Sequence, residues 1–171
     1  MNTTTTNFQQ LYDEYYVDIY RYAYWLSGNS DDAKDITAET FTRLWMNRDN
    51  YQATTIKGYL LTISRNLYLQ GARKQSTSTL DFDVIDPSPS AEQKTSDSSE
   101  FAQVMSARQT QTEVDRTLIL MKSYENLTFL EISKILGVSV ASLKVKLHRA
   151  RKKLSKAVDR EGIQVIKGIK Q

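Results

Sequence analysis

The sequence contains no cysteine, only one histidine and only two prolines. Without cysteine the chain forms no disulfide and offers no thiolate to a metal ion, and the cysteine count gives no sign of an oxidising compartment. The one histidine, His148, has no suitable serine or aspartate partner for catalysis, and the sequence has no glycine-rich phosphate loop. We therefore expect no enzyme, no metal site, no cofactor and no small-molecule substrate.

Long apolar runs are also missing. No run approaches the roughly 20 residues that a membrane-spanning helix needs. The N-terminus is rich in threonine and lacks the apolar core of a signal peptide. The sequence therefore predicts a cytoplasmic protein.

Both prolines, Pro87 and Pro89, fall in a stretch with few large apolar residues. Residues 75–106 are rich in Ser, Thr, Asp, Gln and Ala, and such a segment buries too little surface to offset its ordering entropy. We interpret it as a flexible linker between residues 1–74 and residues 107–171. No alternating run is long enough to indicate a strand, so we expect an all-α protein of two small helical domains.

Three helices are predicted before the linker. Apolar residues recur at spacings of three and four from Phe8 to Leu26, where Gly28 follows as a break. Ser30 is a candidate N-cap for a second helix, whose first turn is acidic and so favourable at the positive end of the helix dipole. A third helix is expected from about Thr55.

An acidic row lies on the second predicted helix. Asp31, Asp35 and Glu39 are four residues apart and so share one face. A row of carboxylates can hold a pair of metal ions in a helical bundle, but that design uses Glu-x-x-His pairs, and the one histidine lies elsewhere. The alternative that remains from the residues alone is a solvated face of the helix.

A helix-turn-helix pattern follows the linker. Thr128 and Glu131 have the spacing of a capping box, and Gly137 stands where a helix end favours a left-handed residue. Ser139 is then the expected cap of a second helix. Its predicted inner face consists of Leu143, Leu147, Ala150, Leu154 and Val158.

The outer face of that second helix is strongly basic. Between Leu143 and Val158 there are seven Lys or Arg residues and no acidic residue. The net charge of the whole chain is only +3, so basic residues are concentrated here. This distribution favours a nucleic acid as partner over a basic helix that only solubilises the protein.

Three segments resemble bacterial sigma factors, in the same order. DDAKDITAETFTRLW (31–45) resembles their core-polymerase-binding segment, and IKGYLLTISRNLYLQGARK (56–74) resembles the segment that reads and opens the minus-ten promoter element. LTFLEISKILGVSVASLKVKLHRARKKL (127–154) resembles the helix-turn-helix that reads the minus-thirty-five element. The size and layout are similar to those of the extracytoplasmic-function (ECF) group.

The resemblance implies a role for each surface. It implies promoter DNA, the clamp coiled coil and the flap of core RNA polymerase, and an anti-sigma factor as partners. The residues implied in polymerase binding are Asp31, Asp35, Glu39, Thr40, Phe41 and Trp45. Those implied at the minus-ten element are Tyr51, Arg65, Asn66 and Arg73. Those implied at the minus-thirty-five element are Ser139, Ser142, Lys144, Val145, Lys146, His148, Arg149 and Arg151.

Two other functions remain open from the residues alone. One is a helix-turn-helix regulator that dimerises through its N-terminal bundle, which would read a palindrome with half-sites about one helical turn apart. The other is a protein-interaction module, which would not bind DNA. A sigma factor instead reads two unlike elements and acts with the polymerase.

Overall fold

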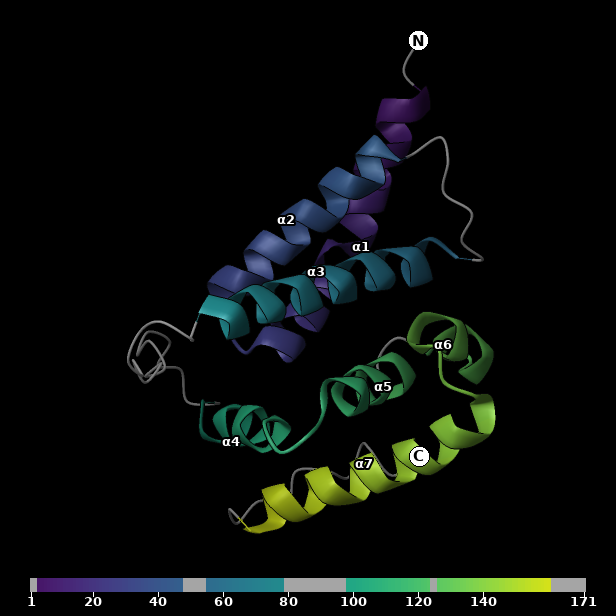
Figure 1. The fold of residues 1–171 in the computed structure, drawn as a ribbon. Coiled ribbons are helices and arrows are strands. Elements are labelled where there is room, and N and C mark those ends of the chain that lie inside the picture. The colour runs from purple at the N-terminus through teal and green to yellow at the C-terminus, as the bar shows by residue number, and fades with distance from the viewer. Residues whose placement is uncertain (1–2, 48–54, 79–97, 124–125, 161–171) are drawn as a thin grey trace.

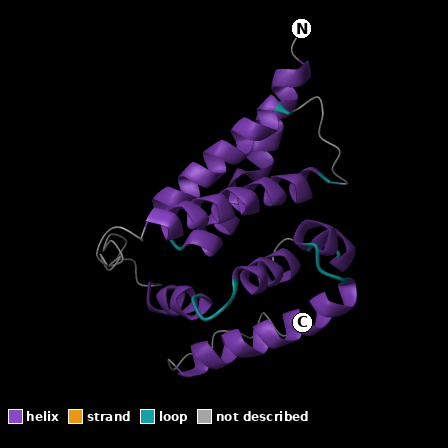
Figure 2. Cartoon of the chain, in the orientation of Figure 1, coloured by secondary structure: helices purple, strands orange, loops and turns teal. Residues whose placement is uncertain are grey.

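The computed structural model describes residues 3–47, 55–78, 98–123 and 126–160, and they form helices joined by short loops (Figures 1 and 2). The helices are α1 (Thr3–Ser27), α2 (Ser30–Met46), α3 (Ile56–Ser78), α4 (Ser98–Arg108), α5 (Glu113–Ser123), α6 (Phe129–Leu136) and α7 (Val140–Arg160). These ranges contain no strand, which confirms the all-α prediction. The end of α3 and most of α4 lie inside the predicted linker, and the rest of that linker lies outside the described residues. None of the described helices is long and apolar enough to cross a membrane.

Helices α1, α2 and α3 pack together as the first unit (Figure 1). Their apolar faces meet in one core, as the three-and-four spacing predicts. The large apolar side chains that are at most 2% exposed in this core are Ile19, Tyr22, Leu26, Phe41, Leu44, Leu60 and Leu61. This packing leaves the opposite face of α2, which carries the acidic row, on the surface.

The N-cap of α2 is Asn29, so the prediction of Ser30 as the cap was wrong. The Asn29 side chain accepts hydrogen bonds from the backbone N–H of Asp31 at 2.8 Å and of Asp32 at 3.1 Å. Asparagine caps as well as serine does, and Gly28 before it adopts a positive φ of 72° that turns the chain out of α1. Ser30 is the first residue of α2.

Helices α4 to α7 form the second unit, in which α7 packs against α4, α5 and α6. All five residues of the predicted inner face of α7 are buried, from Leu143 to Val158. Gly137 ends α6 with a φ of 67°, in the left-handed region that the sequence indicated. The side chain of Ser139 accepts a hydrogen bond from the backbone of Ser142 at 3.3 Å. The helix-turn-helix prediction is therefore confirmed in its caps, its turn and its buried stripe.

The predicted capping box at the start of α6 is present. The Glu131 carboxylate accepts hydrogen bonds of 2.7 Å from both the backbone N–H and the hydroxyl of Thr128, and the Thr128 hydroxyl accepts one from the Glu131 backbone at 3.2 Å. These bonds lower the pKa of Glu131 below its ordinary value, and the bond from the Thr128 backbone contributes most. Folding therefore favours the charged carboxylate.

We expect Glu131→Gln to lower the free energy of unfolding at neutral pH and to have no such effect in acid. The folded-state pKa lies below the unfolded one, so the charge contributes stability above the unfolded pKa and loses it as pH falls through the folded value. Denaturant unfolding of both proteins at pH 7 and near pH 3 measures this difference. An equal difference at both pH values would contradict the assignment.

Candidate nucleic-acid interface

The exposed face of α7 is a continuous basic surface. Its buried side faces α5 and α6, so the remaining positions point to solvent. Exposed side chains on this face are Lys144, Val145, Lys146, His148, Arg149, Lys152, Lys153 and Lys156. Val145 is 51% exposed, which leaves its methyl groups accessible for contact. We call this set the basic face of α7.

Arg151 differs from the other predicted DNA contacts. It is half-buried, and its guanidinium donates a hydrogen bond of 3.1 Å to the hydroxyl of Ser123 at the end of α5. Ser139 and Ser142 are exposed but also serve the fold, because their hydroxyls are hydrogen-bonded at 3.0 Å at the start of α7. These three residues help to hold α7 in place through these hydrogen bonds.

The acidic row on α2 is fully on the surface. Asp31, Asp35 and Glu39 are all exposed. Asp31 lies 3.8 Å from Lys34, and Glu39 accepts a hydrogen bond of 2.9 Å from Arg43 on the same helix. Exposed pairs of this kind contribute little, about 0.3–0.5 kcal/mol each. The row is therefore an anionic surface that a basic partner can engage at small cost.

Thr40 and Phe41, which the resemblance also assigned to polymerase binding, lie inside the first unit. Thr40 is fully buried, and its hydroxyl bonds to the Ile36 carbonyl at 2.6 Å and lies 3.0 Å from the Ser64 hydroxyl. Phe41 is 2% exposed. Neither side chain offers a surface in this structure, so both support the acidic row from beneath. Trp45 is 36% exposed at the end of α2.

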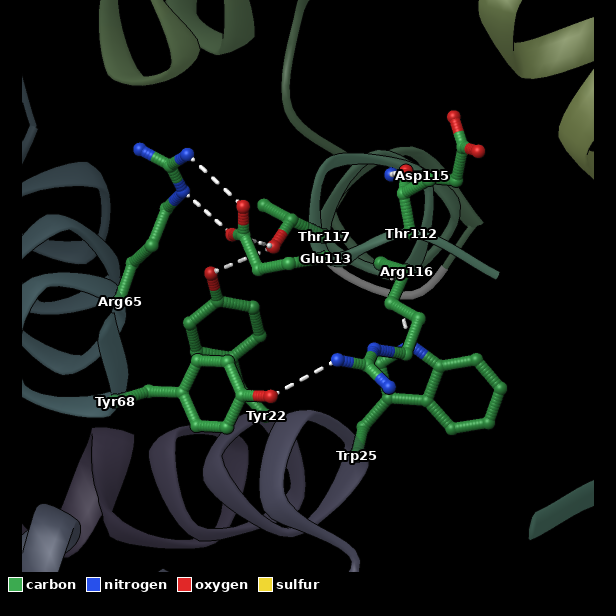
Figure 3. Close-up of polar contacts among 9 residues, drawn as sticks. All are labelled: Tyr22, Trp25, Arg65, Tyr68, Thr112, Glu113, Asp115, Arg116 and Thr117. Carbon is green, nitrogen blue, oxygen red and sulfur yellow. Dashed lines mark hydrogen bonds and ion pairs between the residues drawn. The ribbon is translucent and has the colours of Figure 1, made fainter. Parts of the chain in front are cut away.

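The predicted minus-ten residues have different surroundings. Asn66 and Arg73 are exposed on α3, whereas Tyr51 lies outside the described residues. Arg65 is mostly covered and forms a two-pronged ion pair with Glu113 of α5, at 2.6 and 3.0 Å (Figure 3). Its guanidinium is thus occupied by a carboxylate from the other unit.

The two units are in direct contact around this pair. Thr117 of α5 hydrogen-bonds both to Glu113 at 3.0 Å and to the buried hydroxyl of Tyr22 at 3.2 Å (Figure 3). Burial raises the pKa of that Tyr22 hydroxyl, so it stays protonated. The Trp25 indole N–H donates a hydrogen bond of 2.9 Å to the backbone carbonyl of Arg116 in α5. The sequence could not predict this contact. From the sequence, Glu113 indicates only an acidic residue at the N-terminus of a helix, where it interacts favourably with the helix dipole.

Nothing in the described ranges resembles a metal centre. No group of three or more His, Cys, Asp or Glu side chains there could hold an ion. The carboxylates of the acidic row point outward along one helix, which suits a protein surface better than an inward-facing metal site.

Two family models match this chain. Residues 11–77, which cover most of α1 to α3, match "Sigma-70 region 2". Residues 112–154, which begin just before α5 and end within α7, match "Sigma-70, region 4". The two matches divide the chain as the two packed units do.

Curated relatives of this chain carry sigma-factor names as well. The chain is 35% identical to "ECF RNA polymerase sigma factor SigE" of Mycolicibacterium smegmatis, over 80% of this chain and 55% of the relative. It is 27% identical to "ECF RNA polymerase sigma factor BldN" of Streptomyces coelicolor, over 87% of this chain and 59% of the relative. The chain thus spans little more than half the length of these two relatives.

A solved structure has the same fold. It is that of the sigma factor RpoE in complex with the anti-sigma factor NepR from Bartonella quintana, with a TM-score of 0.74. The two chains are 19% identical, and the match covers 90% of this chain and 97% of the other. At this identity the likeness concerns the fold.

Proposed function

Because this chain belongs to the ECF group of the sigma-70 family, we propose that it is a promoter-specificity subunit of bacterial RNA polymerase. Such a subunit binds core polymerase and recognises two promoter elements, and its own work is binding, not catalysis. We place this activity in the cytoplasm, where polymerase and chromosome are.

The observation that carries the proposal is a pair of oppositely charged faces on two units. The first unit presents the acidic row of α2, and the second presents the basic face of α7. An anionic face repels DNA and suits a basic protein partner, whereas a basic recognition helix suits the phosphates and base edges of a major groove. A chain that carries both faces can connect core RNA polymerase to promoter DNA.

The acidic row is the proposed contact with the clamp coiled coil of core polymerase. Asp31, Asp35 and Glu39 supply the charge, and Trp45 supplies an exposed aromatic edge at the end of the same helix. Thr40 and Phe41 keep α2 in position from the core side. The second unit is the proposed contact with the polymerase flap.

DNA contacts are proposed on both units. On α3, Asn66 is the proposed reader of an unstacked minus-ten base, with Arg65 and Arg73 near phosphates. Tyr51, outside the described residues, is a proposed stacking platform for a base. Holding flipped bases requires binding only, so this proposed site needs no catalytic residue. The basic face of α7 is the proposed minus-thirty-five reader.

An anti-sigma factor is the proposed regulator. The structural neighbour RpoE was solved with the anti-sigma factor NepR. We propose that a protein of this class also binds the present chain and covers its polymerase-binding surface.

Two linked measurements test the proposed function. Core bacterial RNA polymerase and this chain should elute as one complex from a size-exclusion column. On a promoter selected by that complex, unpaired thymines near the start site should become reactive to permanganate only when both are present. No shared elution, together with no thymine reactivity, would contradict the proposal.

Arg149→Ala should weaken binding to all DNA sequences to a similar extent. Arg149 is exposed on the basic face of α7, and a lost phosphate contact lowers the slope of log affinity against log salt by about 0.9. Titrations of a duplex containing the minus-thirty-five element, at several salt concentrations, measure the slope. A loss confined to one base pair would instead identify Arg149 as a base reader.

Val145→Ser should change which base is preferred within the minus-thirty-five element. The exposed valine methyls can contact a thymine methyl, while Lys144 or Lys146 reaches guanine or phosphate. Competition among duplexes that vary at each position of the element measures the preference. An unchanged preference at every position would rule out this contact.

A further inference from the structure

One aromatic ring in the second unit lies beside two lysine ammonium groups. Phe129 is the first residue of α6, and its ring centroid is 4.9 Å from the ammonium nitrogen of Lys122 and 5.9 Å from that of Lys144. Lys122 belongs to the last turn of α5, and Lys144 lies near the start of α7. The end of α5 and the start of α7 both lie next to α6 (Figure 1). We call these three residues the Phe129 cluster.

The ring restricts both lysine side chains. An ammonium within about 6 Å of a ring centroid is attracted to the electron-rich face of the ring. A lysine is otherwise flexible, because four methylene groups separate its charge from the backbone. Lys122 is restricted further, because its ammonium donates a hydrogen bond of 3.1 Å to the Leu127 carbonyl. Charges that are held before a ligand arrives lose less entropy when the ligand binds.

The two ammonium groups are not neutralised by an acid. In the described ranges no Asp or Glu lies within ion-pair distance of Lys122 or Lys144. The pKa of Glu131 is lowered mainly by its hydrogen bonds from Thr128, and the charge of Lys122 contributes least. Two like charges beside one ring repel each other, so an anion that reaches both is favoured there.

The place of the cluster in the helix-turn-helix indicates which anion this is. In this motif the second helix enters the major groove, while the first helix crosses the DNA backbone. Here α7 is the second helix and α6 the first. Phe129 of α6 attracts Lys144 toward the first helix, and so toward a phosphate instead of a base edge.

We propose that the Phe129 cluster is a grip for the DNA backbone, in which the ring positions two ammonium groups for phosphates. The inference rests on the proposed function, because it requires α7 in the major groove. It adds two residues that the sequence did not indicate, since Lys122 lies outside the helix-turn-helix pattern and Phe129 carries no charge. It also assigns Lys144 to phosphate instead of guanine.

Salt titrations of the full chain with a labelled 20-base-pair duplex of mixed sequence test the phosphate contacts. Lys122→Met and Lys144→Met should each lower the slope of log affinity against log salt by about 0.9. Methionine keeps an unbranched side chain but removes the charge. The control is Lys34→Met, which removes the same charge from an exposed position on α2 and should leave the slope unchanged.

Phe129→Leu tests the role of the ring. Leucine keeps an apolar side chain against the core but has no aromatic face. One cation–π contact at an exposed site is equivalent to about two- to fivefold in affinity, so duplex binding should weaken by at least this factor. Phe129→Tyr retains the ring and should bind like the wild type. In the Lys144→Met background Phe129→Leu should have a smaller effect, whereas a purely structural role predicts additive losses.

The position of the ring can also be measured without DNA. In NMR spectra of the free chain, the ring current of Phe129 should shift the ε-methylene protons of Lys144 upfield, and Phe129→Leu should remove this shift. Circular dichroism and denaturant unfolding verify that the Phe129 variants remain folded.

The outcomes separate this inference from the proposed function. If the wild type binds the duplex and Arg149→Ala weakens binding, but Lys122→Met and Lys144→Met behave like Lys34→Met, the grip is overturned and DNA binding by α7 stands. Additive losses from Phe129→Leu and Lys144→Met, or no upfield shift in the wild type, would overturn positioning by the ring. Failure of the wild type to bind any duplex would overturn both the grip and DNA binding by α7.

Discussion

Asp35→Lys combined with Glu39→Lys should abolish transcription that depends on this chain while leaving its fold intact. Both carboxylates are exposed on α2, and within the described residues Glu39 pairs with Arg43 of the same helix. Opposing like charges across an interface costs several kcal/mol, so the affinity for core polymerase should fall about 100-fold or more. Run-off transcription and a binding titration with core polymerase measure the two effects.

A matched control is available on α1. Asp13→Lys combined with Glu14→Lys changes the net charge by the same amount at exposed positions outside the acidic row. This control should keep most of the affinity for core polymerase. Equal losses from both double variants would show a general charge effect and contradict a docking surface on α2.

The second large effect is expected from the core of the helix-turn-helix. Ile132 is fully buried where α6 packs on α7, so Ile132→Ala should lower the free energy of unfolding by about 2–5 kcal/mol. Denaturant unfolding measures this loss, and binding to the minus-thirty-five duplex should weaken with it because α7 loses its support.

Leu130→Ala provides the comparison within the same helix. Leu130 is 62% exposed, so its loss should change the free energy of unfolding by less than about 0.5 kcal/mol. If the two variants were equally stable, the packing of α6 against α7 described above would be contradicted.

The sequence predicted features that depend on local pattern. The capping box of Thr128 and Glu131, the left-handed Gly137 and the buried stripe of α7 all follow from neighbours a few residues apart, and all three are confirmed. The cap of α2 was wrong by one residue. Asn29 and Ser30 are both good caps, and only the backbone turn at Gly28 decides between them.

Long-range features could not be predicted in the same way. Thr40 lies on the hydrophobic side of α2 because its hydroxyl finds the Ile36 carbonyl and Ser64, a pairing with no signature in a periodic pattern. Arg65 and Glu113 are 48 positions apart, and nothing in either segment indicates the other. The charged faces of the candidate site were thus predictable, whereas the contact that covers Arg65 required the structure.

The most direct test of the central claim is run-off transcription on sheared genomic DNA, with core bacterial RNA polymerase alone and with this chain added. We predict new discrete start sites, each preceded by two unlike elements, that depend on the chain and disappear with Asp35→Lys and Glu39→Lys. No new start sites, together with tight binding of the chain alone to a palindrome, would contradict a sigma factor and identify a dimeric regulator.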